Sequence, residues 1–196
     1  MPQLRITKKA AKALGQKKLG GANNELKHPL DDWYMDYTII GSQSFFLLMH
    51  MASRVACVFK FQKGADEERW LEALPSAISY YFDSLEEHDI AVKWGEYLGE
   101  GDVTFDLVKP DSRSVVAHMT QFKQLVQIES VRHQYLSESA LLDAMRCWST
   151  YLISIPTIPC DYSRPMDTLK IQLNDYYGSL YSNVIHYDFK NGHVKH

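Results

Sequence analysis

The chain of 196 residues is 45% hydrophobic and 23% charged, with a formal net charge of −3, which fits one globular domain with a sizeable core and argues against a disordered chain. No apolar run approaches the roughly 20 residues of a membrane-spanning helix, and no signal-peptide-like stretch follows the basic N-terminus, so we expect a cytoplasmic protein. Cys57, Cys147 and Cys160 are widely spaced, which predicts neither a disulfide framework nor a zinc site.

The first predicted elements are a short strand at 4–6 and the helix that follows it. Thr7 is placed to cap the helical stretch KKAAKAL, and Gly15 to stop it. The next stretch, 15–29, is rich in Gly, Asn and Lys and has little to bury. We therefore expect a mobile loop there.

Residues 32–61 are the clearest β region. Three runs rich in aromatic and β-branched residues are separated by short turn-like stretches at 41–44 and 52–54, a spacing that predicts a meander of three antiparallel strands. The middle run is nearly continuous in apolar residues, which is typical of a central strand covered on both faces. We therefore expect four side chains to be buried: Phe46, Leu48, Val55 and Val58.

Helical patterns dominate the rest of the chain. A helix from residue 66 to about 85 carries an apolar stripe, and Pro75 predicts that it is kinked or divided. A strand, VTFDLV, is predicted at 103–108. Further helices are predicted at 112–128, 138–153 and 166–177, and the prolines of 155–165 predict a non-helical connection between the last two.

These elements predict an α+β fold. We expect a small, mainly antiparallel sheet, made of the three-strand meander plus one or more further strands, packed against four to five helices. One domain is expected over residues 1–185, with a flexible C-terminal tail at 186–196.

The charges are distributed unevenly along the chain. Residues 1–27 carry seven Lys and Arg against one acid, whereas residues 66–106 carry twelve acids against two bases. Such asymmetry favours an electrostatic partner, although ordinary solvated surface is the simpler interpretation. The acidic candidates for protein contact are Glu67, Glu68, Glu86, Glu87 and Asp89, and the basic segment 5–27 is a weaker candidate for nucleic acid.

The stretch KPDSRSVV at 109–116 lies between the predicted strand and helix. A helix N-terminus attracts anions, and Lys109, Ser112, Arg113 and Ser114 could together hold a phosphate or carboxylate. The stretch lacks the glycines of a phosphate-binding loop. The simpler interpretation, which we favour, is that Asp111 or Ser112 caps the helix.

Other catalytic and ligand-binding patterns are weak. His186, Asp188, His193 and His196 could bind a metal, but they fall in the predicted tail. Trp33, Tyr34 and Tyr37 could stack bases, although packing is the better interpretation. The sequence has no nucleophile-elbow, Ser-Lys or Cys-His signature. We therefore predict no catalytic residue, metal or cofactor.

Five stretches occur in the order of a known set of motifs. They are ITKKAAKAL (6–14), DDWYMDYTII (31–40), SFFLLMHMASRVACVF (44–59), DSRSVVAHMTQFK (111–123) and IPTIPCDYSRPMDTLKIQL (155–173). This order resembles a family of bacterial, plasmid- or phage-borne domains of unknown function, with a TKK-rich first helix, a DW strand and an N-x-RS-x-LGSMND helix. Ala117–His118 and Thr120–Gln121 depart from that last motif. The resemblance implies a compact α+β domain of bacterial or mobile-element origin and supplies no activity.

Two functional hypotheses follow. The first, which we favour because no catalytic constellation is evident, is a non-enzymatic interaction protein. It would be a regulatory, accessory or anti-defence factor of a mobile element that binds a protein through the acidic surface of 66–106. The alternative is an enzyme or sensor that binds a phosphate-bearing ligand at 109–114.

Overall fold

A computed structural model describes residues 2–23, 25, 28–62, 67–99, 105–154, 162–182, 187–188 and 193–194. Its sheet has five strands in the order β4–β3–β2–β1–β5. The strands are β1 (Gln3–Ile6), β2 (Asp32–Ile40), β3 (Gln43–His50), β4 (Ala56–Phe61) and β5 (Asp106–Val108). The helices are α1 (Lys8–Ala13), α2 (Glu67–Ser84), α3 (His88–Leu98), α4 (Arg113–Arg132), α5 (Glu138–Thr150) and α6 (Pro165–Ser182).

The predicted meander is confirmed. β2 pairs with β3 and β3 with β4, both antiparallel, and Leu48 lies opposite Met35 on one side and Cys57 on the other. The four side chains expected to be buried are at most 3% exposed. The middle strand is therefore central, as its nearly continuous apolar sequence indicates.

The α+β class is confirmed, but the sheet is mixed rather than mainly antiparallel. β1 pairs in parallel with β2 on one side and with β5 on the other. Parallel neighbours need a crossover of a dozen or more residues, and the segment between Ile6 and Asp32, which contains α1, supplies one. The structure also has six helices in its described residues, because residues 88–98 form α3 where no helix was expected.

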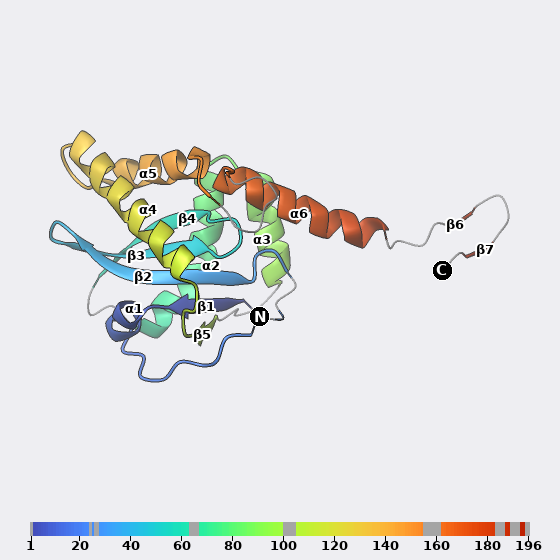
Figure 1. The fold of residues 1–196 in the computed structure, drawn as a ribbon, viewed down its shortest axis with the longest axis horizontal. Helices are drawn as coiled ribbons and strands as arrows, with labels where there is room; N and C mark the ends of the chain where they lie inside the picture. Colours follow the sequence, from blue (N-terminus) through green and yellow to red (C-terminus); the bar gives the residue numbers. More distant parts are fainter. Residues whose placement is uncertain are drawn as a thin grey trace.

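Two layers of helices cover the sheet. On one face, Phe46 packs its ring against Trp70 of α2, and Trp33 packs against Trp94 of α3. On the other face lie α4 and α5, so that the sheet is enclosed between helices, as Figure 1 shows with α4 in front of the strands and α2 behind them. The buried apolar residues of both layers form one cluster.

Local signals set several helix boundaries. The Thr7 hydroxyl accepts a hydrogen bond from the Ala10 amide and caps α1, as predicted. α2 runs through Pro75 as one helix, and the Pro75 carbonyl accepts a bond from the indole of Trp94. None of the described helices has the length and apolar character needed to cross a bilayer.

The C-terminal predictions are tested only in part. The connection at 155–161, His186 and His196 lie outside the described residues. In the predicted tail, β6 (Tyr187–Asp188) and β7 (His193–Val194) pair antiparallel, beyond the end of α6 (Figure 1).

Candidate functional site

A cleft of about 770 Å³ lies at the end of the sheet where β2 begins and β3 ends. Its walls come from the segment that precedes β2, from the β3–β4 turn, from the loop before α4 and from α6. The lining residues that matter here are Arg5, Asp31, Asp32, His50, Arg54, Asp111, Gln172 and Asp175. Parts of the chain that are distant in sequence therefore meet at this end of the sheet.

Arg5 of β1 lies beneath the cleft and is almost completely buried, at 1% exposed. Its Nε and Nη2 donate to the Asp32 carboxylate, each at 2.7 Å, and its Nη1 is 2.6 Å from Asp111 Oδ2. Burial acts to lower the pKa of Arg5, but the hydrogen bond and the charge of Asp32 outweigh it, so that the pKa is raised. Arg5 is therefore a permanent cation held between two carboxylates.

Tyr34 of β2 joins this ion pair to the start of α4. Its hydroxyl donates to Asp111 Oδ1 and accepts from the Ser112 amide at 2.9 Å. Burial and the Asp111 hydrogen bond raise the pKa of Tyr34. For Asp111, partial burial acts to raise the pKa, but the bonds from Tyr34 and Arg5 lower it overall. The beginning of α4 is thus fixed to the sheet by charged and polar contacts.

The expectation of a helix cap at 111–112 is confirmed for Ser112. Its hydroxyl accepts from the Val115 amide at 3.4 Å. The other proposed anion ligands, Lys109, Arg113 and Ser114, are exposed on the surface. The Ser112 hydroxyl is used by the cap, so the anion site at 109–114 stays a prediction that rests on the exposed side chains of Lys109, Arg113 and Ser114.

Arg54 is the second buried arginine of the cleft and is paired very differently. It is 4% exposed, and its Nε donates to Nδ1 of His118 on α4 at 3.2 Å. Its Nη1 is buried and has no hydrogen-bond partner, and within the described chain no carboxylate forms an ion pair with it. Burial lowers the pKa of Arg54, as expected for a charge without a nearby counter-ion.

The turn that carries Arg54 is held in an unusual conformation. Arg54 has a φ of 66°, in the left-handed region that a non-glycine residue rarely adopts and that costs about 1–3 kcal/mol. The turn is fixed by hydrogen bonds: the Arg54 amide donates to the His50 carbonyl, and the Ser53 amide and hydroxyl contact His50 Nδ1. Strain of this kind is concentrated at functional sites.

Three histidines around the cleft have a lowered pKa, which favours the neutral form of their rings at pH 7. Burial, followed by the charge of Arg54, lowers the pKa of His50 to about 3. Burial and Arg54 also lower the pKa of His118, and burial lowers that of His28, which stacks on Tyr97 at 3.9 Å. The positive charge of the cleft therefore comes from Arg5 and Arg54 alone.

The carboxylates of the cleft outnumber its cations. Two arginines face four aspartates, a formal charge of −2. Arg5 occupies two of these acids, and Asp31 accepts from the Tyr97 hydroxyl. Asp175 on α6 is exposed, and the nearby Gln172 has a buried Oε1 with no hydrogen-bond partner. Among the described residues, the walls of the cleft therefore contain two buried polar atoms that have neither a hydrogen bond nor an ion pair, the donor Arg54 Nη1 and the acceptor Gln172 Oε1. The buried Nη1 of Arg5 has its ion pair with Asp111.

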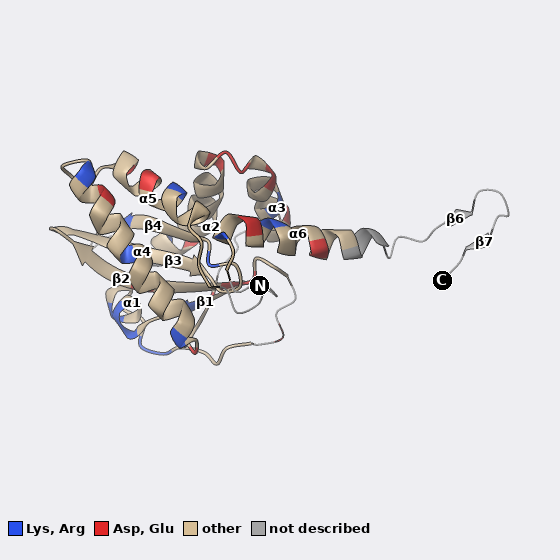
Figure 2. Cartoon of the chain, turned by 45° about the horizontal axis from the view of Figure 1, so that its top comes forward, with Lys and Arg blue, Asp and Glu red and all other residues tan. Residues whose placement is uncertain are grey.

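The acidic candidates for protein contact lie elsewhere. Glu86 and Glu87 form the turn between α2 and α3, and Asp89 lies in the first turn of α3. Glu87 is bound by Lys170 Nζ at 2.7 Å. Glu67 and Glu68 begin α2, but their side chains lie outside the described part of the structure. Acidic residues gather at this end of the molecule, as Figure 2 shows in red near α3.

Sequence reasoning missed the residues that form the cleft. Arg5 and Arg54 were not singled out, and Tyr34 was assigned to packing. A usable signal existed for Arg5, which interrupts the apolar β run at 4–6, because a charge in a buried strand needs a partner. Arg54 lies in the turn before β4, where an arginine gives no such signal. No group of three or more His, Cys, Asp or Glu in the described residues is arranged to hold a metal ion.

Comparison with models of protein families shows which family the chain belongs to. The model of a family described as a domain of unknown function, DUF6933, matches residues 3–167. The chain belongs to the DUF6933 family. This match includes the whole five-stranded sheet and both cleft arginines, whereas Gln172 and Asp175 lie beyond it. The expected membership of an uncharacterised family is confirmed. A search of curated proteins found no match to the chain.

Proposed function

We propose that this DUF6933 protein is a binding protein for a small ligand that carries one carboxylate, held in the cleft by Arg54. The observation that carries the proposal is the buried Nη1 of Arg54, which has no hydrogen-bond partner in the described structure.

The energetics of a buried charge support an anionic ligand. Removing a charge from water costs several kcal/mol even after relaxation, unless it is paired. Arg5 has that pairing from two carboxylates, whereas Arg54 has only the neutral ring of His118. A ligand carboxylate in the cleft would give Arg54 the counter-ion that the described part of the chain does not supply. The planar guanidinium suits a carboxylate because two parallel N–H bonds are available to it.

The charge of the cleft favours a weakly charged ligand over a phosphate-rich one. Its side chains sum to −2, and like charges at close range repel. The free acceptor of Gln172 and the exposed carboxylate of Asp175 suit N–H or ammonium groups on the same ligand. The class of ligand that suits both Arg54 and the acceptors of Gln172 and Asp175 is a small carboxylate with hydrogen-bond donors, such as an amino acid.

The strained turn supports binding by preorganisation. The main chain of Arg54 is held by its amide bond to the His50 carbonyl and by the Trp148 indole, which donates to the Arg54 carbonyl at 2.8 Å. The Arg54 side chain is held by the bond from its Nε to His118. A side chain that is already fixed loses little entropy on binding.

The other roles stay proposals with less support. A protein partner on the acidic surface is consistent with the exposed Glu86 and Asp89. A regulatory, accessory or anti-defence role in a bacterial mobile element and a cytoplasmic location are further proposals, which no contact in the described structure bears on. The ion pair of Glu87 with Lys170 reduces the charge that such a partner would meet.

The test is a titration of the intact protein with a defined panel of the twenty L-amino acids, lactate, inorganic phosphate and AMP. Isothermal calorimetry would measure binding, and the Nε–Hε signals of the arginines in NMR would locate it. We expect at least one donor-bearing carboxylate to bind and to move the Arg54 signal, and Arg54→Met to abolish the heat of binding. The matched control is Arg113→Met, which alters an exposed arginine.

Two results would overturn the proposal. One is a panel in which no compound moves the Arg54 signal up to about 10 mM, a limit well above a millimolar Kd. The other is binding that survives in Arg54→Met. Because the NMR measurement uses the unaltered protein, a variant that fails to fold does not remove the test.

A further inference from the structure

A second hollow, on another side of the molecule, is lined by lysines. It has a volume of about 500 Å³ and shares no lining residue with the cleft. We call it the basic hollow, and its lining residues are Lys8, Ala11, Lys12, Gly15, Gln16, Lys17, Leu19 and Lys109. Four of these eight residues are lysines and none is acidic.

The fold brings together lysines that are far apart in the sequence. Lys8 and Lys12 lie on α1, Lys17 in the loop after it, and Lys109 directly after β5. Gly20 binds this loop to β5, since its amide donates to the Leu107 carbonyl at 2.9 Å and its carbonyl accepts from the Lys109 amide at 3.4 Å. The loop that was expected to be mobile is therefore attached to the sheet at Gly20, and Lys109 lies beside the lysines of α1.

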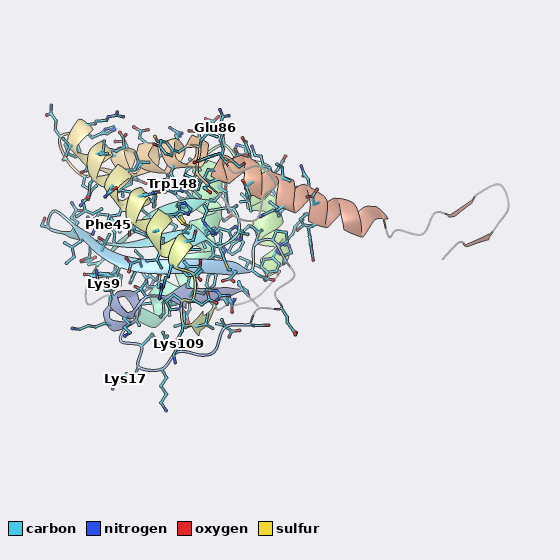
Figure 3. All side chains as sticks on the ribbon, viewed as in Figure 1. Lys9, Lys17, Phe45, Glu86, Lys109 and Trp148 are labelled. Atoms are coloured by element: carbon cyan, nitrogen blue, oxygen red, sulfur yellow. The ribbon has the colours of Figure 1, made fainter. Side chains whose placement is uncertain are left out.

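The charge of the basic hollow is not neutralised within the described chain. All four lysines are exposed, and none forms an ion pair with an acid there. Lys9 and Lys18 are exposed next to them in sequence. Figure 3 places Lys9, Lys17 and Lys109 on one side of the molecule and Glu86 on the opposite side. In Figure 2, blue residues gather on α1 and the loop after it, whereas red residues gather at the turn between α2 and α3.

We propose that the basic hollow binds the phosphate backbone of a double-stranded nucleic acid. Lysine ammonium groups are point charges on flexible stems that neutralise phosphates without reading sequence. The lining residues include no aromatic ring on which unpaired bases could stack, so a single strand gains nothing over a duplex. They also lack an exposed large apolar side chain of the kind that inserts into a lipid surface.

The test is a fluorescence anisotropy titration of the full chain with labelled duplexes of about 20 base pairs, one of DNA and one of RNA, across salt concentrations. Because each neutralised phosphate contributes about −0.9 to the slope of log K against log salt for a DNA duplex, four lysines predict a slope near −4. Duplexes of unrelated sequence should bind alike, and the DNA and RNA arms show which backbone geometry is preferred.

Paired variants with equal charge change separate this surface from general electrostatics. Lys12→Gln with Lys109→Gln should weaken duplex binding about tenfold or more and reduce the salt slope by about two, since two phosphate contacts are lost. The control is Lys60→Gln with Lys123→Gln. Lys60 lies on β4, at the other edge of the sheet from β5, and Lys123 lies on α4. This control pair should retain the affinity and slope of the unaltered protein.

Three results would overturn the inference. They are no duplex binding at about 50 mM salt, where electrostatic contacts are strong, an equal loss in the control pair, and binding to vesicles containing phosphatidylserine without binding to duplexes. Arg54→Met should leave duplex affinity unchanged, so that the fate of this inference and that of the cleft ligand are read separately.

Discussion

The two buried arginines of the cleft show how differently one residue type is used in two regions of a molecule. Arg5, in the parallel half of the sheet, is enclosed by Asp32 and Asp111 and joins β1, β2 and α4. Arg54, in the antiparallel half, is buried to a similar degree and lies in a strained turn, but no acid of the described residues forms an ion pair with it. Removing one partner of a buried ion pair is strongly destabilising, because the other charge is then left buried and unpaired. A buried charge that has no partner in the folded protein reduces stability, and it is available to pair with a ligand.

The largest effect should come from the paired arginine. Arg5→Met keeps the side-chain length but leaves two carboxylates without their cation, so we expect a loss of about 3–5 kcal/mol in the free energy of unfolding. Urea denaturation measures it. The exposed control Lys9→Met should stay within about 0.5 kcal/mol. A loss for Arg5→Met as small as that of the control would mean that the ion pair is not a structural link.

The pH dependence of stability tests the neutral histidine beside Arg54. The pKa of His50 is lowered to about 3 in the folded protein, from 6.5. The unfolded chain therefore binds more protons below pH 6.5, so His50 contributes stability above that pH and loses it as the pH falls toward 3. We expect a slope of about 1.4 kcal/mol per pH unit for each such histidine.

Urea denaturation between pH 7 and about 4.5 measures this slope, because most carboxylates titrate below that pH range. His50→Gln should reduce the slope by about 1.4 kcal/mol per pH unit, which corresponds to one proton. The control Gln16→Ala changes no titratable group and should leave the slope unchanged. An unchanged slope in His50→Gln would show that His50 is not buried as a neutral ring.

A smaller effect is expected at the start of α4, next to Arg5. Ser112→Ala removes the cap bond to the Val115 amide, so we expect a loss of about 1 kcal/mol. Ser114→Ala, at an exposed first-turn position, should change stability by about half of that or less. Equal effects of the two substitutions in thermal unfolding would show that the cap bond contributes little.

The smallest effect on stability should come from Arg54. Arg54→Met removes a buried charge without a counter-ion and one bond to His118, two changes that oppose each other, so we expect stability to remain within about 1 kcal/mol. Urea denaturation of Arg54→Met and Arg5→Met side by side measures the difference in stability loss between the two regions most directly. A loss equal to that of Arg5→Met would show that Arg54 is a structural arginine too.

Local sequence patterns were sufficient for much of the secondary structure. The aromatic and β-branched runs of 32–61 predicted the meander, and the Thr7 and Ser112 caps were readable because capping depends on residues within three positions. The helices α4, α5 and α6 begin within one residue of the predicted starts. α3 was missed because its buried face, Ile90, Ala91 and Trp94, is short and is followed by glycine-rich sequence.

The sequence by itself determined the periodicity, the caps and the core of this protein, since these depend on neighbours along the chain. Only the tertiary structure decided the mixed sheet and the sites. Arg5 meets Asp32 and Asp111 because β1 lies between β2 and β5, and Lys109 joins the lysines of α1 for the same reason. Whether a charge in an apolar strand is paired depends on which strands become neighbours. That choice follows from the packing of the whole chain rather than from any local pattern.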